Sequence, residues 1–141
     1  MTILEKRDAL KEDLSFLPDT EERFRYILDL GRGYAPLADE LKTKDRLLPG
    51  CLSQLWLVPE FKDGICSFGM DADAHITKGI ASMVCNLYNG ETPESILSTD
   101  LEFLSELGIP QVLSANRRNG LSNLRHKIRS FAVASAAGAS S

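Results

Sequence analysis

The chain has 141 residues, of which 16 are basic and 20 are acidic, so its formal net charge is -4 at pH 7. This length can bury roughly two thirds of the unfolded surface in one domain, and the acidic balance argues against binding to nucleic acid or an anionic membrane. The three cysteines include no Cys-x-x-Cys pair, which disfavours a disulfide framework or a zinc site and suits a reducing compartment.

The chain also has no membrane-spanning pattern, because no apolar run approaches the roughly 18 residues that a span requires. The first residues include Glu5, Lys6, Arg7 and Asp8, and this density of charge is atypical of a signal peptide. We therefore expect a cytoplasmic protein whose partner is another protein or a small molecule.

Two helices are predicted near the start of the chain. Each begins with a capping-box pattern, in which a polar residue is followed three positions later by a glutamate: Thr2 with Glu5, and Asp19 with Glu22. Apolar residues then recur at helical spacing, and Gly31 or Gly33 can end the second helix. We expect both helices to be packing elements.

A cysteine follows a predicted glycine turn and precedes a predicted strand. Gly50 permits a tight or left-handed backbone beside Cys51, and Pro49 restrains the loop that leads to it. The run 54–58 is apolar, rich in strand formers and closed by Pro59, which predicts a mostly buried strand. Cys51 is therefore predicted to lie on a loop and is the candidate reactive thiol; the alternative is simple packing, which is common for free cysteine.

A second apolar run at 65–69 is separated from this strand by a loop containing Asp63-Gly64, so an antiparallel hairpin is predicted. Alternation places Cys66 and Phe68 on one face of the second strand. We therefore expect the Cys66 thiol to be packed rather than reactive.

A short run with Asp71, Asp73 and His75 invites comparison with a metal site, but one histidine and two carboxylates are weak support for one. The run precedes a helical pattern that ends at Gly90, so Asp73 is predicted to be the N-cap of this helix. Cys85 lies in the same helix, nearly opposite its apolar stripe. Partial exposure of Cys85 and cover by another helix both stay open.

Three further helices are predicted. Thr92 and Pro93 are typical of a helix start, and leucines at 101, 104 and 107 before Gly108 indicate another helix. Ser114 is predicted to cap the last helix, of roughly 15 residues. Its apolar stripe is Leu121, Leu124, Ile128 and Phe131. We expect residues 1–134 to form a single domain and residues 135–141, which are all small, to fray.

Four blocks of this sequence, across roughly residues 20 to 133, resemble the SufE family of sulfur-acceptor proteins. The first block is Gly50-Cys51-x-Ser53-Gln54-x-Trp56-Leu57. The others are Asp73-Ala74-x-Ile76-x-Lys78-Gly79, Thr92-Pro93 and Ser114-x-x-Arg117-x-x-Gly120-Leu121. All four occur in the order and spacing of the family.

The resemblance implies an α+β fold with a small antiparallel sheet and helices packed on one side, similar to the iron-sulfur scaffold proteins. It also implies a sulfur carrier that assists a cysteine desulfurase rather than an independent enzyme. The Cys51 thiolate would attack the outer sulfur of a desulfurase persulfide, stimulate the desulfurase and pass the sulfur to iron-sulfur cluster assembly.

The expected partners are a pyridoxal-phosphate-dependent desulfurase, either of the SUF type or its close paralogue, and a downstream cluster scaffold. No cofactor or metal is expected in this chain, and a homodimer stays open. By resemblance, Arg117 is expected either to favour the Cys51 thiolate or to contact the partner. Asp73 is the other candidate for a partner contact.

Three alternatives stay open. An iron-sulfur scaffold would need several converging thiolates, whereas Cys51, Cys66 and Cys85 are predicted on a loop, a strand and a helix. An independent thiol enzyme would need a base such as His75 or His126 near Cys51. A non-catalytic desulfurase adaptor would use Cys51 only for packing.

Overall fold

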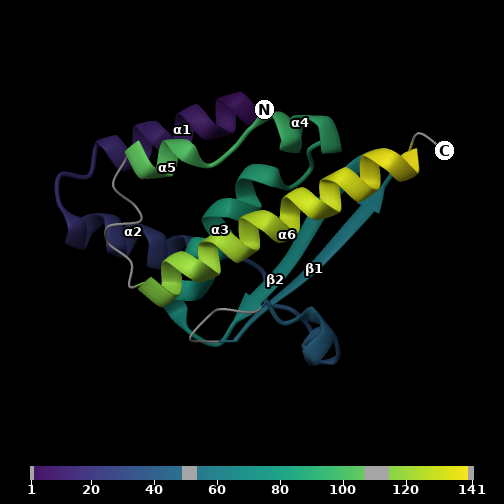
Figure 1. Cartoon of the computed structure of the whole chain (residues 1–141). Helices are drawn as coiled ribbons and strands as arrows, with labels where there is room; N and C mark the ends of the chain where they lie inside the picture. Colours follow the sequence, from purple (N-terminus) through teal and green to yellow (C-terminus); the bar gives the residue numbers. More distant parts are fainter. Residues whose placement is uncertain (1, 49–53, 107–114, 140–141) are drawn as a thin grey trace.

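The structure, a computed structural model, describes residues 2–48, 54–106 and 115–139 of the chain. Figure 1 shows helices arranged around one β-hairpin. The α-helices are α1 (Ile3–Ser15), α2 (Thr20–Gly33), α3 (His75–Tyr88), α4 (Pro93–Ser98), α5 (Glu102–Glu106) and α6 (Ala115–Ala139). Two 3-10 turns, η1 (Asp39–Leu41) and η2 (Lys44–Arg46), precede the strands β1 (Leu55–Lys62) and β2 (Ile65–Ala72).

The first two helices begin where their capping patterns predict. The Thr2 hydroxyl accepts a hydrogen bond from the Glu5 amide at 3.1 Å, and the Glu5 carboxylate accepts one from the Thr2 amide at 3.0 Å. The Asp19 carboxylate likewise accepts the Glu22 amide at 2.8 Å. Since these bonds satisfy amides that have no partner within the helix, they stabilise both helix starts.

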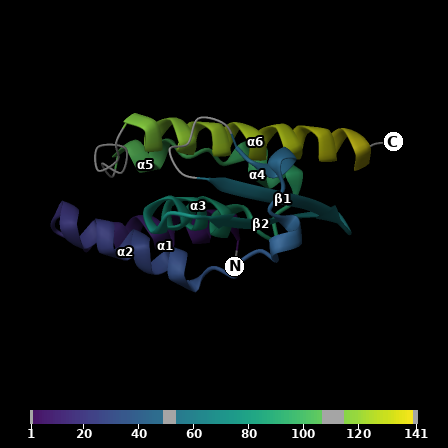
Figure 2. The same ribbon diagram turned by 90° about the horizontal axis from the view of Figure 1, so that it is seen from below.

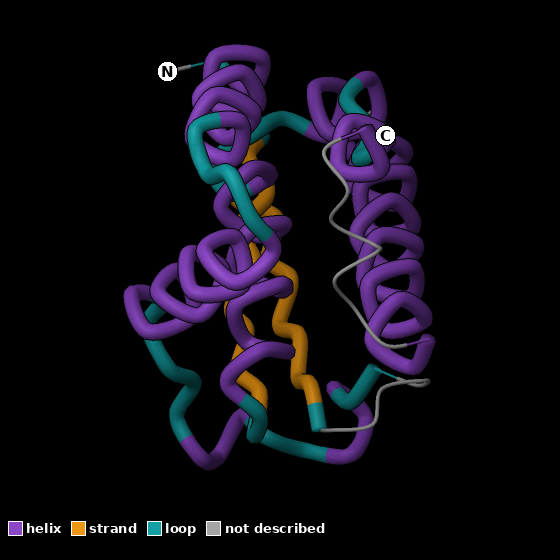
Figure 3. Tube along the Cα trace, turned by 90° about the vertical axis from the view of Figure 1, so that its left-hand side faces the viewer, coloured by secondary structure: helices purple, strands orange, loops and turns teal. Residues whose placement is uncertain are grey.

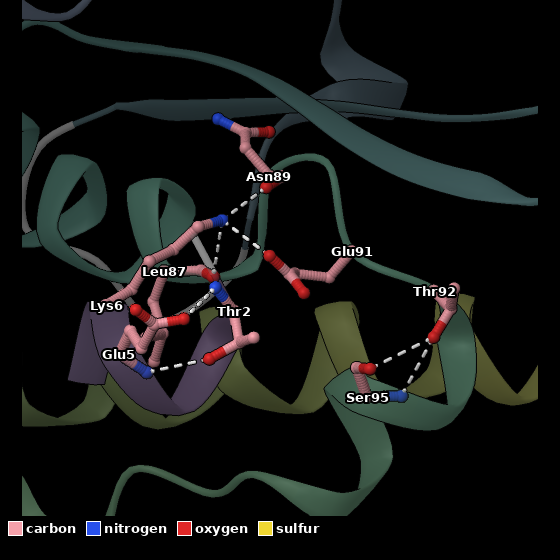
Figure 4. Close-up of polar contacts among 8 residues, drawn as sticks. All are labelled: Thr2, Glu5, Lys6, Leu87, Asn89, Glu91, Thr92 and Ser95. Carbon is pink, nitrogen blue, oxygen red and sulfur yellow. Dashed lines mark hydrogen bonds and ion pairs between the residues drawn. The ribbon is translucent and has the colours of Figure 1, made fainter. Parts of the chain in front are cut away.

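A lysine on α1 attaches this helix to the end of α3, as Figure 4 shows. The Lys6 ammonium group lies 2.7 Å from the Glu91 carboxylate and donates to the backbone oxygens of Asn89 at 2.8 Å and Leu87 at 3.4 Å. The carbonyls at a helix C-terminus have no partner within the helix, so a cation there is favourable.

The predicted hairpin is confirmed. β1 and β2 pair antiparallel from Leu55 opposite Ala72 to Lys62 opposite Ile65. Asp63 and Gly64 form the turn with φ angles of 54° and 79°. Two consecutive left-handed residues are the geometry that matches the twist of a two-residue hairpin.

Strand β1 continues beyond Val58, so the sequence-based end at Pro59 was wrong. Pro59 lies opposite Phe68 in β2. The Phe68 amide donates to Asn89 and its carbonyl accepts from Tyr34, so both groups point away from β1. Residues opposite one another share this orientation, so the Pro59 nitrogen faces the outer edge of β1, where no donor is required.

The hairpin and α3 form the middle of the molecule. Figure 2 shows α6 on one side of them, and α1 with α2 on the other; Figure 3 shows the strands running beside α6. Cys66, Phe68 and Met70 are buried, and the rings of Phe68 and Phe131 meet edge to face with centroids 6.0 Å apart. The predicted α+β class, with a small antiparallel sheet and helices packed against it, is confirmed.

Helices α2 and α3 approach one another through two glycines. A Cβ atom built on Gly31 would lie 2.7 Å from the Gly79 nitrogen, and one built on Gly79 would overlap the Ile27 carbonyl. The absence of side chains at these two positions therefore allows the close packing of α2 against α3, a helix in which most residues are buried.

Residues 135–139, part of the segment that was expected to fray, continue α6 in the structure. Ala132 is fully buried, Ser135 is 7% exposed, and the Ser135 hydroxyl hydrogen-bonds the Cys66 thiol. Alanine is the strongest helix former, and small side chains let this end of α6 lie close to β2. Low apolar bulk is therefore compatible with a helix in this segment.

Candidate functional site

The segment that carries Cys51, residues 49–53, lies outside the described residues, but both of its neighbours are held at the start of β1. The Leu48 amide donates to the Leu55 carbonyl at 2.9 Å, and Leu47 forms an antiparallel bridge with Trp56. The Leu48 side chain is buried. The chain therefore enters and leaves the Cys51 segment at one end of the hairpin.

Asp73 holds the other neighbour of this segment. Its carboxylate accepts the Gln54 amide at 2.9 Å, and its own amide donates to the Gln54 carbonyl at 3.1 Å. The prediction that Asp73 caps α3 was wrong, because the N-cap is Ala74 and no side chain caps this helix. The backbone stays extended one residue longer than expected, which directs the Asp73 carboxylate across the hairpin.

A buried carboxylate with two lysine partners lies beside these anchors. Asp71 is 5% exposed and lies 3.3 Å from the Lys42 ammonium and 3.4 Å from that of Lys78. The carboxylate oxygens of Asp71 also accept hydrogen bonds from the backbone amides of Leu37 at 3.1 Å and Ala72 at 2.9 Å. Burial raises the pKa of Asp71, but the backbone amides and the lysines outweigh burial, so its pKa is lowered overall.

Lys42 also connects the group formed by Asp71, Lys42 and Lys78 to strand β1. The Lys42 nitrogen lies 5.5 Å from the centre of the Trp56 ring, within range of a cation-π interaction. Trp56 and Lys78 belong to the blocks that carried the family resemblance, so a sequence signal existed for both. Lys42 had no such signal, because its contacts depend on the fold bringing segment 39–46 onto the outer side of the hairpin.

We expect Asp71→Asn to lower the free energy of unfolding by about 2 kcal/mol at pH 7, because both lysines lose their buried partner. The folded-state pKa of Asp71 is depressed, so its charge stabilises the fold above the unfolded pKa of 3.8, and this stabilisation disappears as pH falls through the folded pKa. Urea unfolding between pH 7 and pH 3 should therefore show the two proteins converging in acid.

Asp39→Asn is the matched control, since Asp39 also pairs with Lys42, at 3.6 Å, but its side chain is 96% exposed. This variant should unfold like the wild type at every pH, because exposed ion pairs contribute little. A deficit of Asp71→Asn that stayed constant into acid would contradict the electrostatic role of Asp71.

The two described thiols are both inaccessible. Cys66 in β2 and Cys85 in α3 are each 0% exposed. Burial raises the pKa of Cys66 and raises that of Cys85 to about 12, so both thiols are protonated at neutral pH. The prediction that Cys66 packs beside Phe68 is confirmed, and the open question over Cys85 is decided in favour of cover by its surroundings.

Tyr34 covers Cys85 and was not singled out from the sequence. Its hydroxyl hydrogen-bonds the Cys85 thiol, donates to the Phe68 carbonyl at 2.5 Å and accepts from the Asn89 side chain at 2.7 Å. Asn89 also accepts the Phe68 amide at 2.7 Å. This network joins the end of α2, the outer edge of β2 and the end of α3.

Arg117 lies in the first turn of α6, and its side chain is outside the described part of the structure. Its approach to Cys51 therefore stays a prediction. His75 and His126 are exposed on α3 and α6. Among the described residues no three metal-ligating side chains gather, and no helix there is long and apolar enough to cross a membrane.

Comparison of the sequence with known proteins shows which family it matches. The model of the SufE Fe-S metabolism associated domain matches residues 8–132. An uncharacterized SufE-like protein of Rhizobium etli is 37% identical over 135 residues, with 92% of this chain and 91% of the relative covered. A second SufE-like protein, from Rhizobium meliloti, is 31% identical over 130 residues, with coverage of 89% and 93%.

A solved structure supports the fold independently. The solution structure of a hypothetical protein from Thermus thermophilus superposes with a TM-score of 0.79, covering 97% of this chain and 99% of that one, at 18% sequence identity. This likeness concerns the fold alone. The family match covers most of the chain and agrees with the four sequence blocks, so the chain belongs to the SufE family, whose domain is associated with iron-sulfur metabolism.

Proposed function

We propose that this protein accepts persulfide sulfur on Cys51 from a pyridoxal-phosphate-dependent cysteine desulfurase, stimulates that enzyme and passes the sulfur to iron-sulfur cluster assembly. The observation that carries the proposal is the complete burial of the other two thiols, Cys66 and Cys85. Both lack access to a partner and are protonated, whereas sulfur transfer requires an accessible thiolate. Membership of the SufE family supports the same assignment.

The chemistry requires no oxidant and no cofactor in this chain. The Cys51 thiolate attacks the outer sulfur of the desulfurase persulfide, the sulfur-sulfur bond of that persulfide breaks, and the desulfurase cysteine leaves as a thiolate. A new sulfur-sulfur bond on Cys51 replaces the broken one. The protein therefore acts as an accessory to the desulfurase, and we place it with its partner in the cytoplasm.

The anchors beside the Cys51 segment support this role. Leu48 is bonded to Leu55, and Gln54 is bonded to Asp73. Because five residues separate these anchors, we expect Cys51 to be presented at this end of the hairpin. A thiol attached to a fixed end of the sheet can be delivered to a partner's site while the core stays unchanged.

Two further residues receive proposed roles. Asp73 fixes one anchor through the Gln54 amide. The variant Asp73→Asn keeps an acceptor oxygen, so it should stimulate the desulfurase better than Asp73→Ala. Equal losses in the two variants would instead indicate that the carboxylate charge contacts the partner.

Arg117 is proposed to favour the Cys51 thiolate. An unchanged pKa of Cys51 in Arg117→Ala would contradict that role and favour a partner contact.

The direct test is intact-mass spectrometry after incubation with a SUF-type desulfurase, pyridoxal phosphate and cysteine. We expect wild type, Cys66→Ala and Cys85→Ala each to gain about 32 Da, removable by reductant, and Cys51→Ser to gain nothing. A gain on Cys51→Ser would move the chemistry to another thiol. Stimulation without any gain on wild type would indicate a non-catalytic adaptor.

A further inference from the structure

The basic residues of this acidic protein are unevenly distributed. Helix α6 contains five of the 16 basic residues and none of the 20 acidic ones, so the rest of the chain holds all 20 acidic residues against 11 basic ones. A solvated helix usually carries both signs. The charge of α6 is therefore segregated rather than averaged over the surface.

The cations border the outward face of α6. At 3.6 residues per turn, Arg118, Arg125 and Arg129 lie within about 40° of one another on one flank, and Lys127 lies on the other. The opposite side of the helix packs into the core through Leu124, Ile128, Ala132 and Ser135. The surface between the two cationic flanks consists of small or polar side chains and one exposed apolar residue, Val133.

Three of these cations lack an ion-pair partner among the described carboxylates. Arg125, Lys127 and Arg129 form no ion pair with a described carboxylate; Arg129 instead contacts the Leu97 carbonyl at 3.4 Å. Arg125 and Arg129 are four residues apart, a spacing at which like charges destabilise a helix. The repulsion between Arg125 and Arg129 is therefore not offset by an ion pair of either residue with a described carboxylate.

We propose that the outward face of α6 is a docking surface for an acidic surface of a protein partner; on the function proposed above, this partner is the cysteine desulfurase. Figure 1 and Figure 3 show that the first turns of α6 lie at the same end of the molecule as the start of β1. One partner surface can therefore contact α6 and receive the thiol. Opposite charges would accelerate encounter and fix orientation.

A protein fits this face better than another polyanion. The chain as a whole carries -4, so an extended nucleic acid or an anionic membrane would meet repulsion outside α6. Membrane insertion also requires a broad apolar face, whereas the outward positions of α6 are small and polar apart from Val133. Small side chains allow a protein surface to approach closely.

The test is charge reversal with a matched control. Arg125→Glu with Lys127→Glu alters the outward face of α6, and Lys11→Glu with Arg25→Glu makes the same change of charge on α1 and α2, on the other side of the molecule (Figure 2). The concentration of this protein that gives half-maximal stimulation of a SUF-type desulfurase is measured at about 50 and about 300 mM salt. Arg125→Gln with Lys127→Gln is a milder version, and circular dichroism checks folding.

We expect the α6 reversal to raise the half-maximal concentration by about tenfold at low salt and by less at high salt, with the control within about twofold of wild type. The glutamine variant should change in the same direction by a smaller factor. Maximal stimulation should be unchanged, because Cys51 is intact; loss of stimulation in Cys51→Ser tests the proposed function separately.

Equal half-maximal concentrations for the α6 reversal and its control would overturn the docking surface while leaving the sulfur-acceptor function intact. The proposal would also be overturned if, without the desulfurase, the α6 reversal variant sedimented differently from the wild type. The outward face of α6 would then join two copies of this chain. Binding of a labelled DNA duplex that is lost in the α6 reversal would also overturn the assignment to a protein.

Discussion

Replacing Cys51 with serine is expected to abolish stimulation of the desulfurase, so that turnover in the presence of the variant equals turnover of the desulfurase alone. A serine hydroxyl is not ionised at neutral pH and cannot take up the outer sulfur of a persulfide, whereas a thiolate can. The variant should still bind, because the substitution changes one atom, and it should therefore inhibit stimulation by wild type competitively. Alanine release from cysteine measures the effect.

The other two cysteines supply the controls. Cys66→Ala and Cys85→Ala remove thiols that are fully buried, so stimulation should persist at temperatures where these variants remain folded. If Cys51→Ser stimulated the desulfurase as strongly as the wild-type protein does, the proposed sulfur transfer would be contradicted. A non-catalytic adaptor would then be the explanation. Loss of stimulation in a folded Cys85→Ala protein would contradict the inaccessibility of that thiol.

Gly79→Ala is expected to lower the free energy of unfolding by about 3 kcal/mol, the largest effect on stability among these predictions. A methyl group at this position would overlap the Ile27 carbonyl, which belongs to the backbone of α2 and cannot rotate away. Overpacking of a rigid contact forces the helices apart and reduces the burial of their neighbours. Urea unfolding followed by circular dichroism measures the change.

Gly33→Ala is the control for this prediction. Gly33 is also a helical glycine, in the last turn of α2, but a Cβ atom there would meet nothing within 4 Å. Since alanine is the better helix former by up to about 1 kcal/mol, this variant should be as stable as wild type or more so. A similar loss in both variants would show that the α2 and α3 contact does not depend on Gly79.

Local structure was the part that the sequence predicted well, because its causes lie within a few residues. The side chains of Thr2 and Asp19 cap their helices by accepting hydrogen bonds from backbone amides three residues later. Asp63 and Gly64 adopt the left-handed conformations that a two-residue hairpin needs. Each of these choices is decided by neighbouring backbone groups, which the order of residues specifies directly.

Predictions failed where a distant segment competed for the same group. Asp73 has the right position to cap α3, but its carboxylate binds the Gln54 amide, 19 residues earlier, instead. Pro59 was interpreted as a strand end, but β1 continues past it. The backbone amide and carbonyl of Phe68, the residue opposite Pro59, bond to Asn89 and Tyr34 rather than to β1, so the proline nitrogen faces the outer edge of the hairpin. In both cases a contact between residues far apart in sequence overrode the local preference.

The sequence by itself determined the family, the starts of α1 and α2, the hairpin and the candidate thiol, since these depend on residue order and short-range geometry. Only the tertiary structure decided that Cys85 is buried, that Asp71 is shared by Lys42 and Lys78, and that the cations of α6 border one outward face. Burial and charge partners are properties of the packed chain: they depend on which helices cover which strands, and those contacts join residues that no local pattern relates.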